Sequence, residues 1–74
     1  MVAQIAVSSA VYAIDKPYSY QVPDHLKVLP GMRVMLPFGR GNKPTEGVVL
    51  SVETGSDEGL KAIESCLDEV YRNK

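Results

Sequence analysis

Two tyrosines separated by one residue are the side chains in this sequence best suited to hold a planar ligand. Tyr18 and Tyr20 follow Pro17 and flank Ser19 in a segment that alternates apolar and polar residues. Aromatic rings stack on nucleic-acid bases, and each stacked base contributes roughly 1–3 kcal/mol in proteins that bind single strands. Both tyrosines also share the face of Val22, a pattern typical of core packing. We therefore expect at least one of them to be buried, which leaves the other as a candidate for base stacking.

A basic, glycine-rich segment at residues 39–47 is a second candidate for nucleic-acid chemistry. Glycines let backbone N–H groups approach a phosphate closely, and Arg40 and Lys43 are candidate phosphate contacts in this segment. The specific nucleotide-binding patterns do not match, because Pro44 stands where a dinucleotide loop needs glycine and no Gly-Lys-Ser/Thr follows. Taken alone, the segment favours a flexible hairpin loop.

Histidine and cysteine, two residue types common in catalysis, occur once each. His25 is the single histidine and follows Pro23-Asp24, so a solvated loop position is expected. Cys66, the single cysteine, lies on an apolar stripe with no histidine near it in sequence, which indicates a buried thiol rather than a nucleophile. The sequence predicts no catalytic site, no metal site and no cofactor for this domain. Acidic residues near the C-terminus lack the ligand spacing of a calcium loop and predict a solvated face; they are Asp57, Glu58, Glu64, Asp68 and Glu69.

Length and composition describe one small globular domain over residues 1–74. The chain is 45% hydrophobic and 23% charged, as in ordinary globular domains. A lone cysteine excludes an internal disulfide and suits a reducing compartment. No apolar run approaches the roughly 18 residues of a membrane helix, and the N-terminus lacks a secretory pattern, so we expect cytoplasmic residence and no membrane partner. The net charge of −1 argues against non-specific wrapping of duplex DNA, so any nucleic-acid contact must be local and short.

β-Branched and alternating residues predict strands at residues 2–11, 18–22, 32–38 and 48–52. Pro37, near the end of the third strand, indicates a sheet edge or a bulge. The segment at residues 59–70 is ambiguous. Its helical spacing rests on Leu60, Ile63, Leu67 and Val70, whereas Ile63, Ser65 and Leu67 could line one face of a strand. The predicted fold class is mostly β to α+β, a small curved antiparallel sheet or open barrel of about four or five strands.

The order of these segments resembles the opening domain of PriA-type replication-restart helicases. The resemblance rests on residues 16–23 (KPYSYQVP), residues 30–40 (PGMRVMLPFGR), Gly47-Val48-Val49 and Leu60-Lys61. The family pattern reads approximately as an aromatic residue, a small or acidic residue and tyrosine, followed by a proline and G-x-R-V-x-V-P-F-G. The resemblance covers nearly the whole chain.

This resemblance implies a pocket for the 3′-terminal nucleotide of a DNA strand, made of Tyr18, Ser19, Gly39 and Lys61. Tyr18 would hold the terminal base, Gly39 would let the backbone approach, and Lys61 would meet polar or phosphate groups. Better-known members carry aspartate in place of Ser19, which accepts a hydrogen bond from the free 3′-hydroxyl. A neutral serine is a weaker acceptor and does not repel a 3′-phosphate, so the preference for a free 3′-hydroxyl should weaken.

The resemblance also implies that residues 1–74 are a fragment of a longer helicase chain. Full-length members are ATP-dependent 3′→5′ DNA helicases that reload the replicative helicase, whereas this domain alone would not be an enzyme. The implied partners are the single-stranded 3′ end of forked DNA, the other domains of the parent helicase, and primosome or single-strand-binding proteins. The family places its last segment as extended chain, which leaves helix and strand equally favoured for residues 59–70.

Two other interpretations remain open. Small barrels with a G-x-R-V-x-x-P hairpin resemble SH3-like docking domains, so the chain could be a protein-interaction module without nucleic-acid binding. Alternatively, it could be a structural subdomain that covers a larger enzyme. Titration with a short single-stranded oligonucleotide separates the docking interpretation from DNA binding, because a docking module should ignore it.

Overall fold

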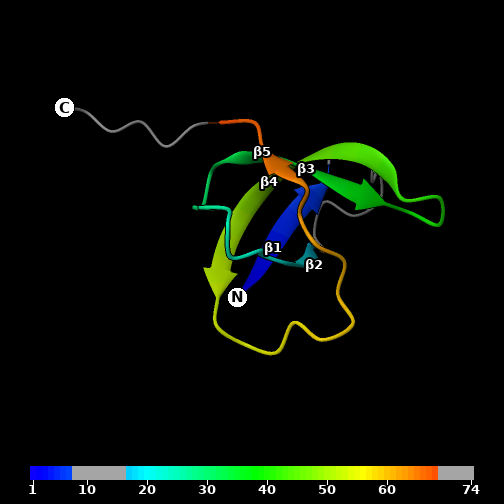
Figure 1. Cartoon of the computed structure of the whole chain (residues 1–74). Helices are drawn as coiled ribbons and strands as arrows, with labels where there is room; N and C mark the ends of the chain where they lie inside the picture. The colour runs from blue at the N-terminus through cyan, green and yellow to red at the C-terminus, as the bar shows by residue number, and fades with distance from the viewer. Residues whose placement is uncertain (8–16, 69–74) are drawn as a thin grey trace.

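The computed structural model of the chain describes residues 1–7 and 17–68, which form one curved sheet (Figure 1). Its strands are β1 (Val2–Val7), β2 (Tyr18–Gln21), β3 (Arg33–Phe38), β4 (Lys43–Glu53) and β5 (Ser65–Cys66). They lie in the order β2-β1-β4-β3-β5, and every neighbouring pair is antiparallel. The described residues contain no helix, so the predicted mostly-β fold with a small curved antiparallel sheet is confirmed. Nothing in these two ranges could cross a bilayer as a helix.

The predicted strand boundaries need two adjustments. The strand predicted at residues 2–11 is confirmed as far as Val7, and residues 8–11 lie outside the described residues. β4 begins at Lys43, five residues earlier than predicted, so the flexible loop predicted over residues 39–47 is wrong beyond residue 42. The turn itself is tight, because Gly39 (φ 79°) and Asn42 (φ 52°) both adopt left-handed backbone. Strand pairing therefore resumes directly after the turn.

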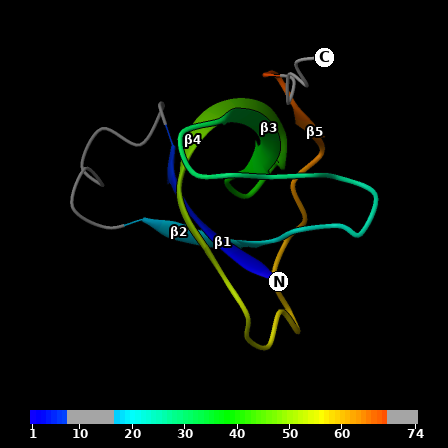
Figure 2. The same cartoon turned by 90° about the vertical axis from the view of Figure 1, so that its left-hand side faces the viewer.

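β4 bends so that it pairs with two neighbours in succession, and Figure 2 shows it curling over the end of the sheet. Its first half pairs with β3 and its second half with β1. Gly47 lies where the two pairings meet, opposite Val34 on one side and Val7 on the other. A Cβ at Gly47 would lie 2.6 Å from Ile5 Cγ2 and 3.2 Å from the Ala6 carbonyl oxygen. Glycine is therefore required here by the close approach of the Ile5 side chain and the Ala6 carbonyl of β1.

A stretch of extended chain before β5 closes the curved sheet by pairing with β2. The N–H of Gln21 donates to the carbonyl of Lys61 at 2.8 Å, and the N–H of Ile63 donates to the carbonyl of Gln21 at 3.1 Å. Gln21 and Ala62 thereby form a parallel bridge. Because β5 pairs with β3 at the other edge, residues 61–66 join the two ends of the sheet into a barrel-like ring (Figure 2).

This pairing decides between the two predictions for residues 59–70. The helix is wrong as far as residue 68, and residues 69–70 lie outside the described residues. Ile63 is buried, but Leu67, which the helical spacing would also bury, is 42% exposed. Backbone hydrogen bonds with two open sheet edges outweigh a weak helical spacing, because open edges offer ready partners to an extended segment.

The core fills the interior of this ring. It consists of Ala3, Ile5, Val7, Tyr20, Val28, Val34, Leu36, Val49 and Ile63. Tyr20 also ties β2 to β3, which are not neighbours in the sheet, because its hydroxyl donates to the Pro37 carbonyl at 2.6 Å. Pro37 lies on the part of β3 that β5 does not cover, so the predicted edge position of this proline is confirmed.

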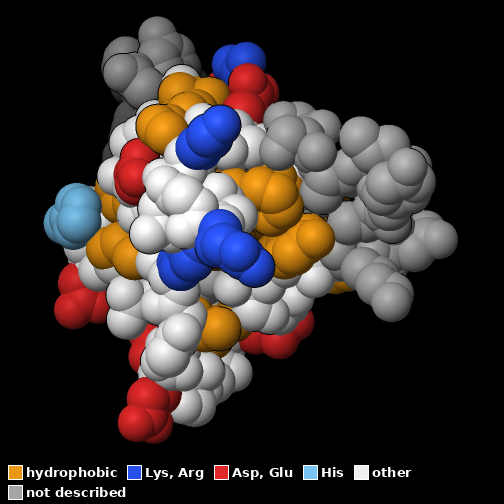
Figure 3. Space-filling view, turned by 90° about the vertical axis from the view of Figure 1, so that its right-hand side faces the viewer, with side chains coloured by type: hydrophobic (Ala, Val, Ile, Leu, Met, Phe, Trp, Pro, Cys, Tyr) orange, Lys and Arg blue, Asp and Glu red, His pale blue; other side chains and the backbone are white. Residues whose placement is uncertain are grey.

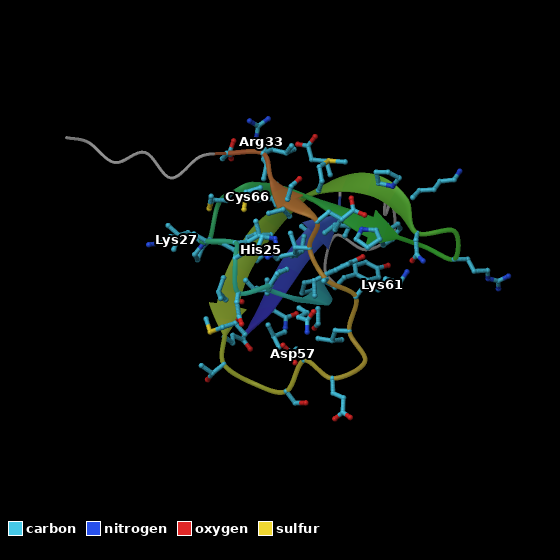
Figure 4. The ribbon with its side chains drawn as sticks, viewed as in Figure 1. His25, Lys27, Arg33, Asp57, Lys61 and Cys66 are labelled. Carbon is cyan, nitrogen blue, oxygen red and sulfur yellow. The ribbon has the colours of Figure 1, made fainter. Side chains whose placement is uncertain are left out.

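An ion pair holds the end of the described chain on β3. Arg33 donates to Asp68 Oδ1 through Nε at 3.1 Å and Nη2 at 2.7 Å, and its backbone N–H donates to Oδ2 at 2.9 Å. These hydrogen bonds lower the pKa of the Asp68 carboxyl. Asp68 is thus a partnered side chain rather than part of the purely solvated acidic face that the sequence predicted. Figure 4 shows Arg33 on the opposite side of β5 from Lys61.

Candidate nucleic-acid interface

A cavity of about 460 Å³ opens at the place where the ring closes. Three segments line it: the first residues of β2, the end of β3 with its turn, and residues 59–61, which lead into the closing segment (residues 61–66). The lining residues are Tyr18, Ser19, Tyr20, Phe38, Gly39, Gly59, Leu60 and Lys61. This lining contains all four residues predicted to form the pocket: Tyr18, Ser19, Gly39 and Lys61. Residues up to 43 positions apart in the sequence are therefore brought together by sheet closure.

Tyr18 and Phe38 form the aromatic wall of the cavity. Their ring centroids are 5.1 Å apart and their planes meet at 86°, an edge-to-face contact that aromatic pairs prefer. Tyr18 is 38% exposed, whereas Phe38 is half-buried and packs against the core. Tyr18 therefore offers accessible ring surface, and Phe38 holds that ring in place.

Tyr20 lies on the same side of β2 as Tyr18 but is only 4% exposed. Its hydroxyl is used by the hydrogen bond to Pro37. Burial raises the pKa of Tyr20, and the nearby Tyr18 raises it further, so Tyr20 stays neutral. The prediction that at least one tyrosine packs in the core is confirmed, and Tyr18 is the one that remains accessible.

Ser19 lies between the two tyrosines, is exposed, and belongs to the cavity lining. Its cross-strand partner is Gln4 of β1. The Ser19 hydroxyl donates to Gln4 Oε1 at 3.2 Å. The β1–β2 register therefore places Ser19 directly opposite Gln4, within hydrogen-bonding distance.

Lys61 and Gly39 face each other across the cavity mouth. The Lys61 ammonium donates to the Gly39 carbonyl at 2.8 Å, and an ammonium has three donors, so two remain for other acceptors. Gly39 needs its left-handed φ of 79° to start the turn, and a Cβ built on it meets no atom within 4 Å. Figure 4 shows Lys61 beside the end of β3 that carries this turn.

Two more exposed cations follow Gly39: Arg40 in the β3–β4 turn and Lys43 at the start of β4. Neither lines the cavity. Figure 3, which faces this end of the molecule, shows Lys and Arg side chains grouped beside exposed hydrophobic side chains, with Asp and Glu side chains towards the margins. Lys61, Arg40 and Lys43 thus place three cations near this end of a chain whose net charge is −1.

Three lining residues were not predicted as site residues: Phe38, Gly59 and Leu60. Phe38 was visible only as the last apolar residue of an alternating strand, and it precedes the turn glycine directly. Gly59 has a φ of 81°, which turns the chain into the closing segment. The signal that could have found Phe38 is its place at a strand end between a proline and a turn, where a large ring has no partner strand on one side.

The two reactive residue types lie away from the cavity. His25 is exposed in the turn after β2, as predicted. Cys66 is half-buried on β5, its Sγ lies 3.6 Å from the carbonyl oxygen of Lys27, and burial raises the pKa of its thiol. A raised pKa disfavours the thiolate, which is the nucleophilic form.

A barrel-like sheet of five strands, with an aromatic and lysine-bearing cavity at its point of closure, defines a small β-barrel binding domain. The chain matches the family model described as the 3′DNA-binding domain (3′BD) of PriA over residues 4–72. The chain belongs to this family of DNA-binding domains.

A curated relative agrees with this assignment. The chain is 38% identical over 71 residues to the replication restart protein PriA of Bacillus subtilis (strain 168). The alignment covers 89% of this chain and 9% of the relative, so the chain spans about a tenth of the length of that protein.

Proposed function

We propose that this chain is the module that recognises the 3′ end of the nascent leading strand at a stalled replication fork. By holding that end, it directs a PriA-type helicase to the fork for primosome assembly and replication restart. The observation that carries the proposal is the assembly of Tyr18, Ser19, Gly39 and Lys61 around one cavity. The family supplies the class of ligand, and the cavity supplies the reason to expect an end rather than a continuous strand.

The size of the cavity supports a short ligand. About 460 Å³ lies in the lower part of the range of about 300–1,000 Å³ found for small-molecule sites, which suits one terminal nucleotide. Tyr18 presents its ring for stacking on the terminal base. Lys61 directs its remaining donors to the sugar-phosphate, and the neutral Ser19 hydroxyl contacts the terminal 3′-hydroxyl.

The charge distribution supports few phosphate contacts. Arg40 in the β3–β4 turn and Lys43 at the start of β4 would meet the phosphates of the preceding nucleotides. With Lys61 they make three cations at one end of a chain whose net charge is −1. A few contacts suit a strand end, and the remaining affinity for forked DNA would come from other domains of the parent helicase.

A protein-docking role is the second candidate. The observation that favours it is the outer face of β4, where Val48 is 39% exposed and Leu50 is 50% exposed. The two roles use different surfaces, because neither of these residues lines the cavity. An oligonucleotide titration separates them, since docking through β4 is independent of DNA.

The decisive experiment is a competition between single strands that differ only at their ends. The chain is offered the same sequence with a 3′-hydroxyl, with a 3′-phosphate, and as a circle. We expect the 3′-hydroxyl strand to bind severalfold to about tenfold better than a blocked end, as for one ordinary hydrogen bond of about 0.5–1.5 kcal/mol.

The variant Ser19→Asp sharpens this experiment. A carboxylate is a stronger acceptor for the terminal hydroxyl and repels a 3′-phosphate, so discrimination against the phosphate should increase. If both proteins bind circular and linear strands equally well, end recognition is wrong and the docking role becomes the better account of this chain.

A further inference from the structure

The Ser19 hydroxyl makes a hydrogen bond within the chain in the absence of DNA. It donates its proton to Gln4 Oε1 at 3.2 Å, and Gln4 is its directly opposite residue in the β1–β2 pair. Gln4 is half-buried on a central strand, so its side chain has less freedom than one on an exposed loop. The strand register therefore places the two side chains opposite each other at the surface of the sheet.

A serine hydroxyl has one proton to donate and two lone pairs that accept. When Gln4 takes the proton, only the accepting lone pairs remain for another molecule. A terminal 3′-hydroxyl can donate to such a group, whereas a 3′-fluoro end of nearly the same size cannot. Gln4 therefore controls which hydrogen-bonding role Ser19 is able to play.

We propose that Gln4 is a positioning residue that fixes the Ser19 hydroxyl as a hydrogen-bond acceptor for the end of the bound strand. Gln4 does not line the cavity, so it acts through Ser19 and not by touching the nucleotide. The pair of neutral side chains thereby selects an end that can donate a hydrogen bond. This inference rests on the proposed function, because it presupposes that Ser19 meets the terminal hydroxyl.

The test compares oligonucleotides that end in a 3′-hydroxyl or in a 3′-fluoro group, two uncharged ends of similar size. In the unmodified chain we expect a preference for the hydroxyl of about two- to tenfold, as for one net hydrogen bond. Gln4→Leu should at least halve that preference, because the Ser19 proton is released and can turn toward the ligand. Binding of the 3′-fluoro strand should stay within about twofold, whereas a merely structural loss would weaken both strands alike.

Conservative and matched variants complete the test. Gln4→Glu should keep or raise the preference, because a carboxylate accepts the Ser19 proton more strongly. Gln21→Leu, on the same face of β2 but opposite Val2, should leave the preference unchanged. In a Ser19→Ala background, Gln4→Leu should have no further effect on it.

Two failures can be told apart. If Ser19→Ala removes the preference for the 3′-hydroxyl but Gln4→Leu does not change it, the role of Gln4 is wrong and the proposed site stands. If Ser19→Ala itself leaves the preference intact, Ser19 does not meet the terminal hydroxyl and the proposed function loses that contact.

Discussion

Two regions depend on glycine for opposite physical reasons. We call the β1–β4 contact at Gly47 the seam, and the turns at Gly39 and Gly59 beside the cavity the corner. At the seam, Gly47 is required because a Cβ would lie 2.6 Å from Ile5 Cγ2. At the corner, a Cβ on Gly39 or Gly59 would meet no atom within 4 Å, and both glycines have φ near 80°. The seam uses glycine to bring two strands together, and the corner uses it to turn the chain while leaving space. One glycine is needed for close packing, and the others are needed for left-handed turns.

The largest effect should follow from filling the seam. Gly47→Val forces branched carbons into the space of Ile5 and the Ala6 carbonyl, and overpacking of this kind costs about 3 kcal/mol at the upper end of the usual range. Urea unfolding should show a lower midpoint with an unchanged m-value. Gly55→Val is the matched control, because a Cβ at Gly55 meets no atom within 4 Å. Equal stability of the two variants would show that the seam is not tight.

Removing the exposed ring of the corner should damage binding instead of folding. Tyr18→Ala deletes a side chain that is 38% exposed, so the folded state should survive. Loss of one stacked base, about 1–3 kcal/mol, corresponds to roughly five- to 150-fold weaker binding of a short single strand. Tyr18→Phe should bind within about twofold of the original, because stacking needs the ring and not the hydroxyl. Fluorescence anisotropy measures both; a folded alanine variant that binds normally would remove Tyr18 from the site.

Adding a methyl group at the corner should test backbone strain without crowding. Gly39→Ala has room for its Cβ but must hold a φ of 79°, which costs an L-residue about 1–2 kcal/mol. Thermal unfolding should show the loss. Gly41→Ala, in the same turn but without a positive φ, should be nearly neutral. If Gly41→Ala lowers the stability as much as Gly39→Ala does, the effect belongs to the turn as a whole and not to the positive φ of Gly39.

The smallest effect concerns the salt dependence of binding. A strand end offers few phosphates, so log K should fall with log salt concentration at a slope of about −0.7 per contacted phosphate. Lys61→Ala should flatten that slope by less than one contact's worth, because its ammonium is shared with the Gly39 carbonyl. Lys27→Ala is the control, since Figure 4 shows Lys27 on the far side of the molecule. A steep slope, indicating many contacts, would contradict a pocket for one strand end.

Much of the sheet could be predicted because its signals are local. The alternation of apolar and polar residues predicted β2 and β3 to within one residue at each end. A strand with one buried face shows this alternation directly in its sequence. The start of β4 was missed because Lys43 and Pro44 look like loop residues until their pairing with β3 is known. The closing segment was undecidable for a similar reason: its conformation depends on edges that are distant in the sequence.

The site was predicted in part, and by a different route. Composition alone favoured a core role for one tyrosine and a loop role for Gly39, and the family pattern added Ser19 and Lys61. The cavity contains all four. Phe38 was missed because a single apolar residue at a strand end looks the same whether it fills a core or lines a pocket. The Gln4–Ser19 pair was invisible because it depends on strand register.

The closing segment also bears on the behaviour of the protein at high concentration. Unpaired strand edges recruit other chains into sheets and promote aggregation. Residues 61–66 cover part of β2 on one side and part of β3 on the other, so a single short segment shields both ends of the sheet at once. A chain cut before residue 59 would retain four strands yet expose both edges, and we expect it to be colloidally unstable as well as unable to form the cavity.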